Sequence, residues 1–135
     1  MRKPKVFKTT DRPVFSDLDP HRIVNSEKYL SYFLKHRMTA LRENLGWDMK
    51  TMFQLPFAFV IKEVNIKYLR PLYDDSEFEI HSHVSEWQNM DALVDCTLLK
   101  NGKENAKCRM VVTAIDPKTQ RPMSWPDDIV EQFYE

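Results

Sequence analysis

Glycine is scarce in this chain of 135 residues: only Gly46 and Gly102 occur, against eight prolines. Loops that cradle phosphate groups, of the P-loop or Rossmann kind, need several glycines close together. Both classes of nucleotide-binding site are therefore excluded. Gly102 follows Asn101, and this pair predicts a type I′ hairpin between two strands.

An excess of one charge is also missing. The chain has 20 Lys and Arg and 20 Asp and Glu, so its formal net charge is zero. This balance argues against a protein that binds nucleic acid through bulk positive charge, although it leaves a local basic patch open. We therefore expect no nucleic-acid partner. Zero net charge also does little to keep copies of the chain apart.

Cysteine is limited to Cys96 and Cys108, which both fall within apolar strand patterns. No CxxC pair is present, so two buried free thiols are expected rather than a zinc site or a disulfide. His81 and His83 share one face of a predicted strand, as metal ligands would. That face also carries glutamates, so we interpret it as a solvent or interface face. We expect no metal.

Long apolar runs are absent as well. No stretch approaches the ~18 apolar residues of a membrane span, and the N-terminal MRKPKVFKTTDRPVF lacks the apolar core of a secretory signal. We therefore expect a cytoplasmic protein without a membrane partner. The chain is 42% hydrophobic and 30% charged, with the length of one ordinary domain. We interpret residues 1–135 as a single domain.

One long helix stands among strand patterns. Apolar residues three and four apart predict a helix over Ser26–Gly46, with Ser26 or Asn25 as its N-cap and Gly46 just past its end. The strand patterns lie at residues 5–17, 57–69, 76–87, 90–100 and 104–116, with a bulge near 62–63 and a short terminal helix over 127–135. One helix on an antiparallel sheet is an α+β fold. A partner subunit usually covers the second face of such a sheet.

Two carboxylates, Asp17 and Asp19, lie directly before the long helix. Acids in this place commonly bind only loop amides. Alternatively, one of them does chemistry beside the helix N-terminus, where unpaired N–H groups stabilise an anion. The residues alone leave both interpretations open.

These acids and two later motifs resemble the hot-dog fold thioesterases, specifically the 4-hydroxybenzoyl-CoA thioesterase group. The matching residues are the D-x-D of Asp17 to Asp19 with Asn25-Ser26 and Tyr29, the Y-L-R-P of Tyr68–Pro71, and Arg121-Pro122 with Pro126. The resemblance covers nearly the whole chain. D-x-D and Y-L-R-P are each weak signals alone, and at this spacing they are specific together.

The resemblance implies a hot-dog fold, in which a five-stranded antiparallel sheet wraps a long central helix. It implies a homodimer joined sheet edge to sheet edge, or a homotetramer, that hydrolyses acyl-CoA thioesters at the dimer interface without a cofactor beyond the CoA of the substrate. It places Asp19 as the catalytic carboxylate, either base or nucleophile, and the backbone N–H near Ser26 as the oxyanion donor. Thioester hydrolysis requires both parts.

The sequence departs from the family pattern at Arg22, where many relatives have glycine. If this residue adopts a positive φ, arginine strains the loop. If it does not, Arg22 can reach a substrate carboxylate or a CoA phosphate. We take His21, Arg22 and Asn25 as candidate substrate-binding residues, although a solvated loop histidine is the simpler interpretation of His21.

The same departure motivates a second function, a hot-dog protein without hydrolytic activity that binds an acyl-CoA or acyl-carrier ligand. A third alternative is a cystatin-like α+β cone. Such folds usually place more than one helix before the sheet.

Overall fold

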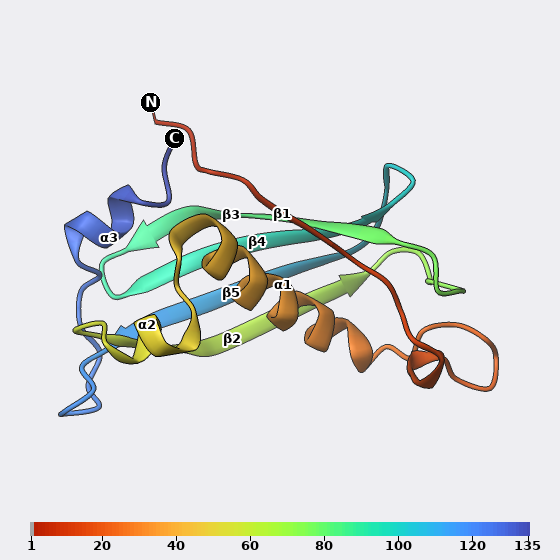
Figure 1. Ribbon diagram of the computed structural model, residues 1–135, viewed down its shortest axis with the longest axis horizontal. Coiled ribbons are helices and arrows are strands. Elements are labelled where there is room, and N and C mark those ends of the chain that lie inside the picture. The colour runs from red at the N-terminus through yellow and green to blue at the C-terminus, as the bar shows by residue number, and fades with distance from the viewer. Residues whose placement is uncertain (1) are drawn as a thin grey trace.

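A computed structural model describes residues 2–135. Five antiparallel strands form one sheet in the order β1-β3-β4-β5-β2, and α1 crosses one face of it (Figure 1). The predicted α+β fold is confirmed. The elements are β1 (Phe7–Asp11), the 3-10 turn η1 (Phe15–Asp17), α1 (Lys28–Leu45), α2 (Met49–Phe53), β2 (Ala58–Tyr68), β3 (Phe78–Gln88), β4 (Asp91–Lys100), β5 (Lys103–Ile115) and α3 (Asp127–Glu131).

The core lies between α1 and the inner face of the sheet. Alternate side chains of β3, β4 and β5 point to this face because the side-chain period of a strand is two. Burying each large apolar side chain there contributes roughly 1.5–3 kcal/mol. The buried apolar residues of these strands are Phe78, Ile80, Val84, Ala92, Val94, Cys96, Leu98, Ala106, Cys108, Met110, Val112 and Ala114. From α1 they meet Tyr29, Tyr32, Phe33, Ala40 and Leu41.

Several local predictions are confirmed. The register of β2 against β5 shifts between Ile61 and Glu63, at the predicted bulge. Asn101 and Gly102 both have positive φ, 54° and 76°, as a type I′ turn requires. Gly46 ends α1 with a φ of 70°. Both cysteines are buried and free, and burial raises their thiol pKa values, to about 11 for Cys96 and about 12 for Cys108.

The predicted start of the long helix is wrong by two residues. Glu27, not Ser26 or Asn25, is the N-cap of α1. The Asn25 side chain instead accepts a hydrogen bond from the Glu27 N–H at 3.2 Å, and its carbonyl accepts one from Lys28 at 2.9 Å. Asn25 therefore stabilises a turn that leads into α1.

Other boundaries also differ from the prediction. The first strand covers only residues 7–11 of the predicted 5–17, because Pro13 offers no N–H to a ladder and residues 15–17 turn into η1. The short α2 was not predicted. Asp48 caps it by accepting the Thr51 N–H at 2.8 Å.

A strand precedes α1 and pairs with β3, and α2 has only five residues. Two long helices ahead of the sheet, as in a cystatin-like cone, are therefore not seen among residues 2–135.

His36 is the polar centre of the helix–sheet core, with 2% of its surface exposed. Its Nδ1 lies 2.7 Å from Thr9 Oγ1 on β1, and its Nε2 lies 2.6 Å from Ser82 Oγ on β3. Burial, with a smaller effect from neighbouring Arg37, lowers its pKa to about 4. His36 therefore joins α1 to two strands as a neutral imidazole.

We expect the free energy of unfolding to decrease as the pH falls from about 6.5 toward 4. In this window the unfolded chain binds a proton on His36 that the folded chain excludes, so stability rises with pH. The expected loss between about pH 7 and pH 5 is ~2 kcal/mol, measured by urea denaturation. His36→Gln keeps a neutral hydrogen-bonding side chain and should lack this part of the dependence. An equal pH dependence in both proteins would contradict the assignment.

Candidate active site

Asp17 fixes the loop that precedes α1. Its Oδ2 accepts hydrogen bonds from the Val14 N–H at 3.0 Å and from the Tyr32 hydroxyl at 2.6 Å. Its carbonyl accepts the Asn25 N–H at 2.9 Å. Burial, with the hydrogen bond to Asp17, raises the pKa of Tyr32, so this hydroxyl stays a donor. Asp17, the first acid of the D-x-D motif, therefore has a structural role: it holds the loop against α1.

Only one of the two carboxylate oxygens of Asp19 accepts hydrogen bonds from the loop. Its Oδ1 accepts hydrogen bonds from the N–H groups of His21, at 2.8 Å, and Ile23, at 3.4 Å. Backbone hydrogen bonds from Asp19 to Ile23 and from Arg22 to Asp19, both 2.9 Å, close the same loop. Its Oδ2 makes no hydrogen bond to any of residues 2–135. Oδ1 therefore binds loop amides, as the first interpretation made from the sequence expects, and Oδ2 has no hydrogen-bond partner among these residues.

The N–H of Ser26 is a free donor next to the start of α1. The following amides are occupied, since Glu27 and Lys28 donate to Asn25 and Tyr29 donates to the Ser26 carbonyl at 3.4 Å. Within the described part of the chain, the Ser26 N–H has no acceptor. Such N–H groups at a helix start can receive an anion.

A surface hollow of about 310 Å³ brings the two groups together. Asp19, Asn25 and Ser26 line it together with Ile23, Val24, Tyr29 and residues 68–71. Two of the predicted site residues, His21 and Arg22, are exposed and do not line it. A wider hollow of about 480 Å³ lies on the outer face of the sheet and contains none of the predicted site residues. Figure 1 shows the loop before α1 beside the end of β2.

The end of β2 holds the helix start from the other side. The Tyr68 hydroxyl donates to the Ser26 carbonyl at 3.1 Å, and its ring meets Tyr29 edge-on with centroids 5.2 Å apart. The Val24 N–H donates to the Leu72 carbonyl at 2.7 Å. The hydrogen bond that positions Ser26 was missed, because a tyrosine at a strand end carries no signal of its hydroxyl's partner.

Arg22 has a φ of 65°, so the loop requires the left-handed conformation that glycine adopts most easily. Of the two alternatives stated for Arg22, the structure shows the first, in which a positive φ strains the loop. A non-glycine residue in this region costs roughly 1–2 kcal/mol. The arginine side chain is exposed at the rim of the loop.

The histidines of β3 lie outside this site. Among residues 2–135, no group of three or more His, Cys, Asp and Glu side chains is arranged to hold a metal ion. His81 Nε2 lies 3.3 Å from a Glu79 carboxylate oxygen. No helix in the described part of the chain combines the length and the apolar character needed to cross a bilayer.

A single long helix on a five-stranded antiparallel sheet is the architecture of a hot-dog protein. The chain belongs to the thioesterase-like superfamily, whose family model matches residues 13–133.

Two curated relatives have names that describe enzymes. The acyl-CoA thioesterase YbgC of Haemophilus influenzae is 25% identical over 124 residues, covering 91% of this chain and 90% of the relative. The long-chain acyl-CoA thioesterase FadM of Escherichia coli is 25% identical over 118 residues, covering 86% and 88%. Among solved structures, a Staphylococcus aureus protein in complex with CoA has a TM-score of 0.85 at 16% identity, covering 98% of this chain and 84% of that one. That likeness shows the fold.

We expect Arg22→Gly to raise the free energy of unfolding by about 1 kcal/mol. Glycine removes the cost of the left-handed conformation, and the greater freedom of the unfolded chain offsets part of the gain. Urea denaturation measures the change. Arg22→Ala is the matched control, because it removes the same side chain but keeps the Cβ. A gain in the alanine variant equal to that in the glycine variant would assign the effect to the side chain instead.

Proposed function

We propose that this protein hydrolyses acyl-CoA thioesters, with Asp19 and the Ser26 N–H as the reacting site. The observation that carries the proposal is that Asp19, which has a carboxylate oxygen without a partner among residues 2–135, and Ser26, whose N–H also has none, line one hollow at the start of α1. Thioester hydrolysis requires a base or nucleophile and a donor for the developing oxyanion. The two relatives named as acyl-CoA thioesterases support the same reaction.

In the general-base route, Asp19 Oδ2 takes a proton from water while the water oxygen bonds to the thioester carbonyl carbon. The carbonyl oxygen becomes an oxyanion, which the Ser26 N–H and the positive end of α1 stabilise. The C–S bond then breaks, and the CoA thiolate takes the proton back from Asp19. In the nucleophilic route, Oδ2 itself bonds to the carbon, CoA leaves, and water hydrolyses the resulting anhydride. Both routes use the same two groups.

Three further residues are proposed to bind the substrate. Asn25 lines the hollow. His21 and Arg22 lie on the same loop with exposed side chains. The positive φ of Arg22 constrains its backbone but leaves the exposed guanidinium able to contact a CoA phosphate, and such contacts are charge-assisted.

Asp19→Asn tests the carboxylate against a panel of aromatic, short-chain and longer acyl-CoAs. We expect thiol release by the native protein on some member, and a decrease of kcat by about 10²–10⁴ in the variant. Asparagine keeps an Oδ1 that can accept the His21 and Ile23 amides, so the loop should stay folded. The exposed Asp75→Asn serves as the control and should retain activity. Full activity in Asp19→Asn would keep the reaction but reject this residue as its carboxylate.

A hot-dog protein that binds acyl-CoA without hydrolysing it is the second candidate. The arginine in the left-handed position at Arg22 favours it, because the strain falls in the loop that carries Asp19. In that case no thiol is released from any acyl-CoA, while acyl-CoA still raises the melting temperature. Absence of both responses would point to an acyl group carried on a protein.

We further propose that the protein acts as a homodimer joined along β2, or as a homotetramer made of two such dimers. This strand is at the edge of the sheet. Its Val60, Ile61 and Val64 side chains are 45%, 42% and 36% exposed. An exposed apolar edge strand is a template for pairing with another chain. The hollow is built partly from the end of β2, so a partner there would border the site.

Val64→Asp should shift the protein toward monomer and lower activity with it, because two like charges would face each other near the joined edges. Light scattering after size-exclusion chromatography measures the mass. Met90→Asp, an exposed apolar side chain at the β3–β4 turn, is the matched control and should leave the mass unchanged. A monomeric native protein with full activity would reject the proposed assembly.

A further inference from the structure

A basic hollow adjoins the one that contains Asp19 and Ser26. Its volume is about 430 Å³, and it lies between the segment after β2 and the β4–β5 turn. The two hollows share the lining residues Leu69, Arg70 and Pro71, so one elongated ligand can occupy both. Figure 1 shows the β4–β5 turn, the β2–β3 loop and the loop before α1 at the same end of the molecule. The other residues that line the basic hollow are Tyr73, Lys100, Asn101, Lys103 and Asn105.

The charges that line the basic hollow are all positive. They belong to Arg70, Lys100 and Lys103, and no acidic residue lines it. The Lys100 Nζ forms an ion pair with Asp74 at 2.9 Å. Neither Arg70 nor Lys103 forms an ion pair with any of residues 2–135. Two cations of the described chain are therefore left without a counter-charge at this hollow.

The β4–β5 hairpin places two of the cations side by side. Lys100 pairs directly with Lys103 in the ladder, and Asn101 and Gly102 form the turn between them. Side chains at directly opposite positions share one face of a hairpin, and like charges there destabilise it. Asp74 neutralises only one of the two lysines. A bound anion would remove the remaining repulsion.

A buried asparagine holds the backbone of Arg70 in place. Asn105 is 5% exposed, and its carbonyl accepts hydrogen bonds from the N–H groups of Leu69 and Arg70 at 2.8 and 3.1 Å. Its side-chain amide donates to the carbonyls of Arg70 and Pro71, both at 3.3 Å. Arg70 itself is exposed. A fixed backbone with a free guanidinium suits a phosphate group, whose oxygens can accept two parallel N–H groups from arginine.

The spacing between the two hollows fits the length of CoA. Tyr68, which donates to the Ser26 carbonyl, pairs with Ala106 of β5. Lys103 comes three residues before Ala106, which corresponds to about 10 Å along the strand. CoA carries its sulfur and its phosphate groups at opposite ends of the pantetheine arm. This arm is longer than that span when it is extended.

We propose that the basic hollow binds phosphate groups of CoA, with Arg70 and Lys103 as the cations that contact them. The inference rests on the proposed function, which places the thioester in the hollow that shares residues 69–71 with this one. Tyr73, which is 60% exposed, offers its ring for stacking on the adenine. CoA has a pyrophosphate and a separate 3′-phosphate, so a contact with Arg22 is compatible with this assignment.

Calorimetric titration with CoA tests the basic hollow separately from hydrolysis, because CoA is a product and its binding requires no turnover. Pantetheine, which has no phosphate group, and inorganic phosphate are titrated in parallel at equal ionic strength. We expect CoA to bind at least about tenfold more tightly than either, with an affinity that falls as salt is added. Absence of CoA binding would overturn the proposal. An affinity for pantetheine or for inorganic phosphate equal to that for CoA would also overturn it.

Two variants identify the cations. Arg70→Met and Lys103→Met each remove one charge and keep an unbranched side chain. We expect each to weaken CoA binding about tenfold, to reduce its salt dependence and to leave pantetheine binding unchanged.

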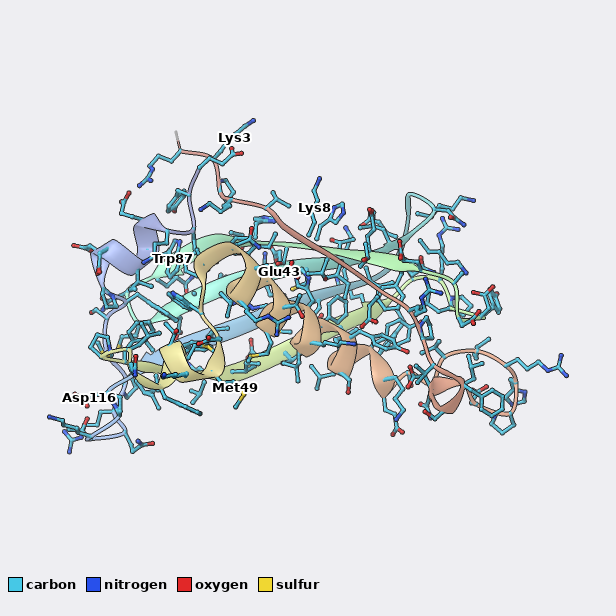
Figure 2. The ribbon with its side chains drawn as sticks, in the orientation of Figure 1. Lys3, Lys8, Glu43, Met49, Trp87 and Asp116 are labelled. Carbon is cyan, nitrogen blue, oxygen red and sulfur yellow. The ribbon has the colours of Figure 1, made fainter. Side chains whose placement is uncertain are left out.

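Lys118→Met is the matched control and should leave CoA binding unchanged. Lys118 is exposed like Lys103 and forms no ion pair within residues 2–135. It lies two residues after Asp116, which Figure 2 labels at the other end of the sheet from the β4–β5 turn. Unchanged CoA affinity in both Arg70→Met and Lys103→Met would overturn the assignment.

Thiol release decides the proposed function independently of this test. A native protein that binds CoA through Arg70 and Lys103, but releases no thiol from any acyl-CoA, would support the basic hollow and reject hydrolysis. Thiol release by a native protein whose CoA affinity does not depend on either cation would support hydrolysis and reject the phosphate assignment.

Discussion

The packing of α1 against the sheet is the contact on which the rest of the structure depends. The buried stripe of α1 joins the inner side chains of β3, β4 and β5 in one core. His36 reinforces this contact, since its two ring nitrogens reach Thr9 and Ser82. With the helix axis fixed in this way, its start is placed beside the end of β2. There the hydrogen bond from Tyr68 to the Ser26 carbonyl sets the position of the first free amide. The site is therefore a consequence of helix packing.

The two acids before α1, Asp17 and Asp19, differ in how many of their carboxylate contacts hold the loop in place. Asp17 uses its carboxylate to connect η1 to Tyr32 of α1. Asp19 uses one oxygen to close its own loop and leaves the other free. This tight closure requires a residue with positive φ, which falls on Arg22. A strained residue beside a free carboxylate is typical of functional loops, where other contacts maintain an otherwise costly backbone.

Features set by local periodicity could be predicted from the sequence. The alternation of the strands, the β2 bulge and the Asn101-Gly102 turn depend on a few neighbouring residues, and each was placed correctly. The pairing of Asp19 with Ser26 was predicted from the family resemblance alone, and the structure places both residues at one hollow. What could not be predicted depends on contacts between distant segments: where α1 begins, that Asp48 starts an extra helical turn, and that Tyr68 reaches Ser26.

Arg37 was missed for a related reason. It lies four residues from both Phe33 and Leu41 along α1, so helical geometry places it beside the buried stripe. Its charge, however, suggested a solvent-facing position, because arginine is seldom buried without a partner.

Two adjacent polar residues of α1, His36 and Arg37, thus enter the core and solve the problem of burial differently. His36 can lose its proton, and burial lowers its pKa far enough to leave a neutral ring between two hydroxyls. Burial also lowers the pKa of Arg37, but a guanidinium stays protonated at neutral pH. Arg37 therefore cannot become neutral by losing its proton. Arg37 instead keeps partial exposure to solvent, as a charged side chain requires when it has no ion pair within residues 2–135.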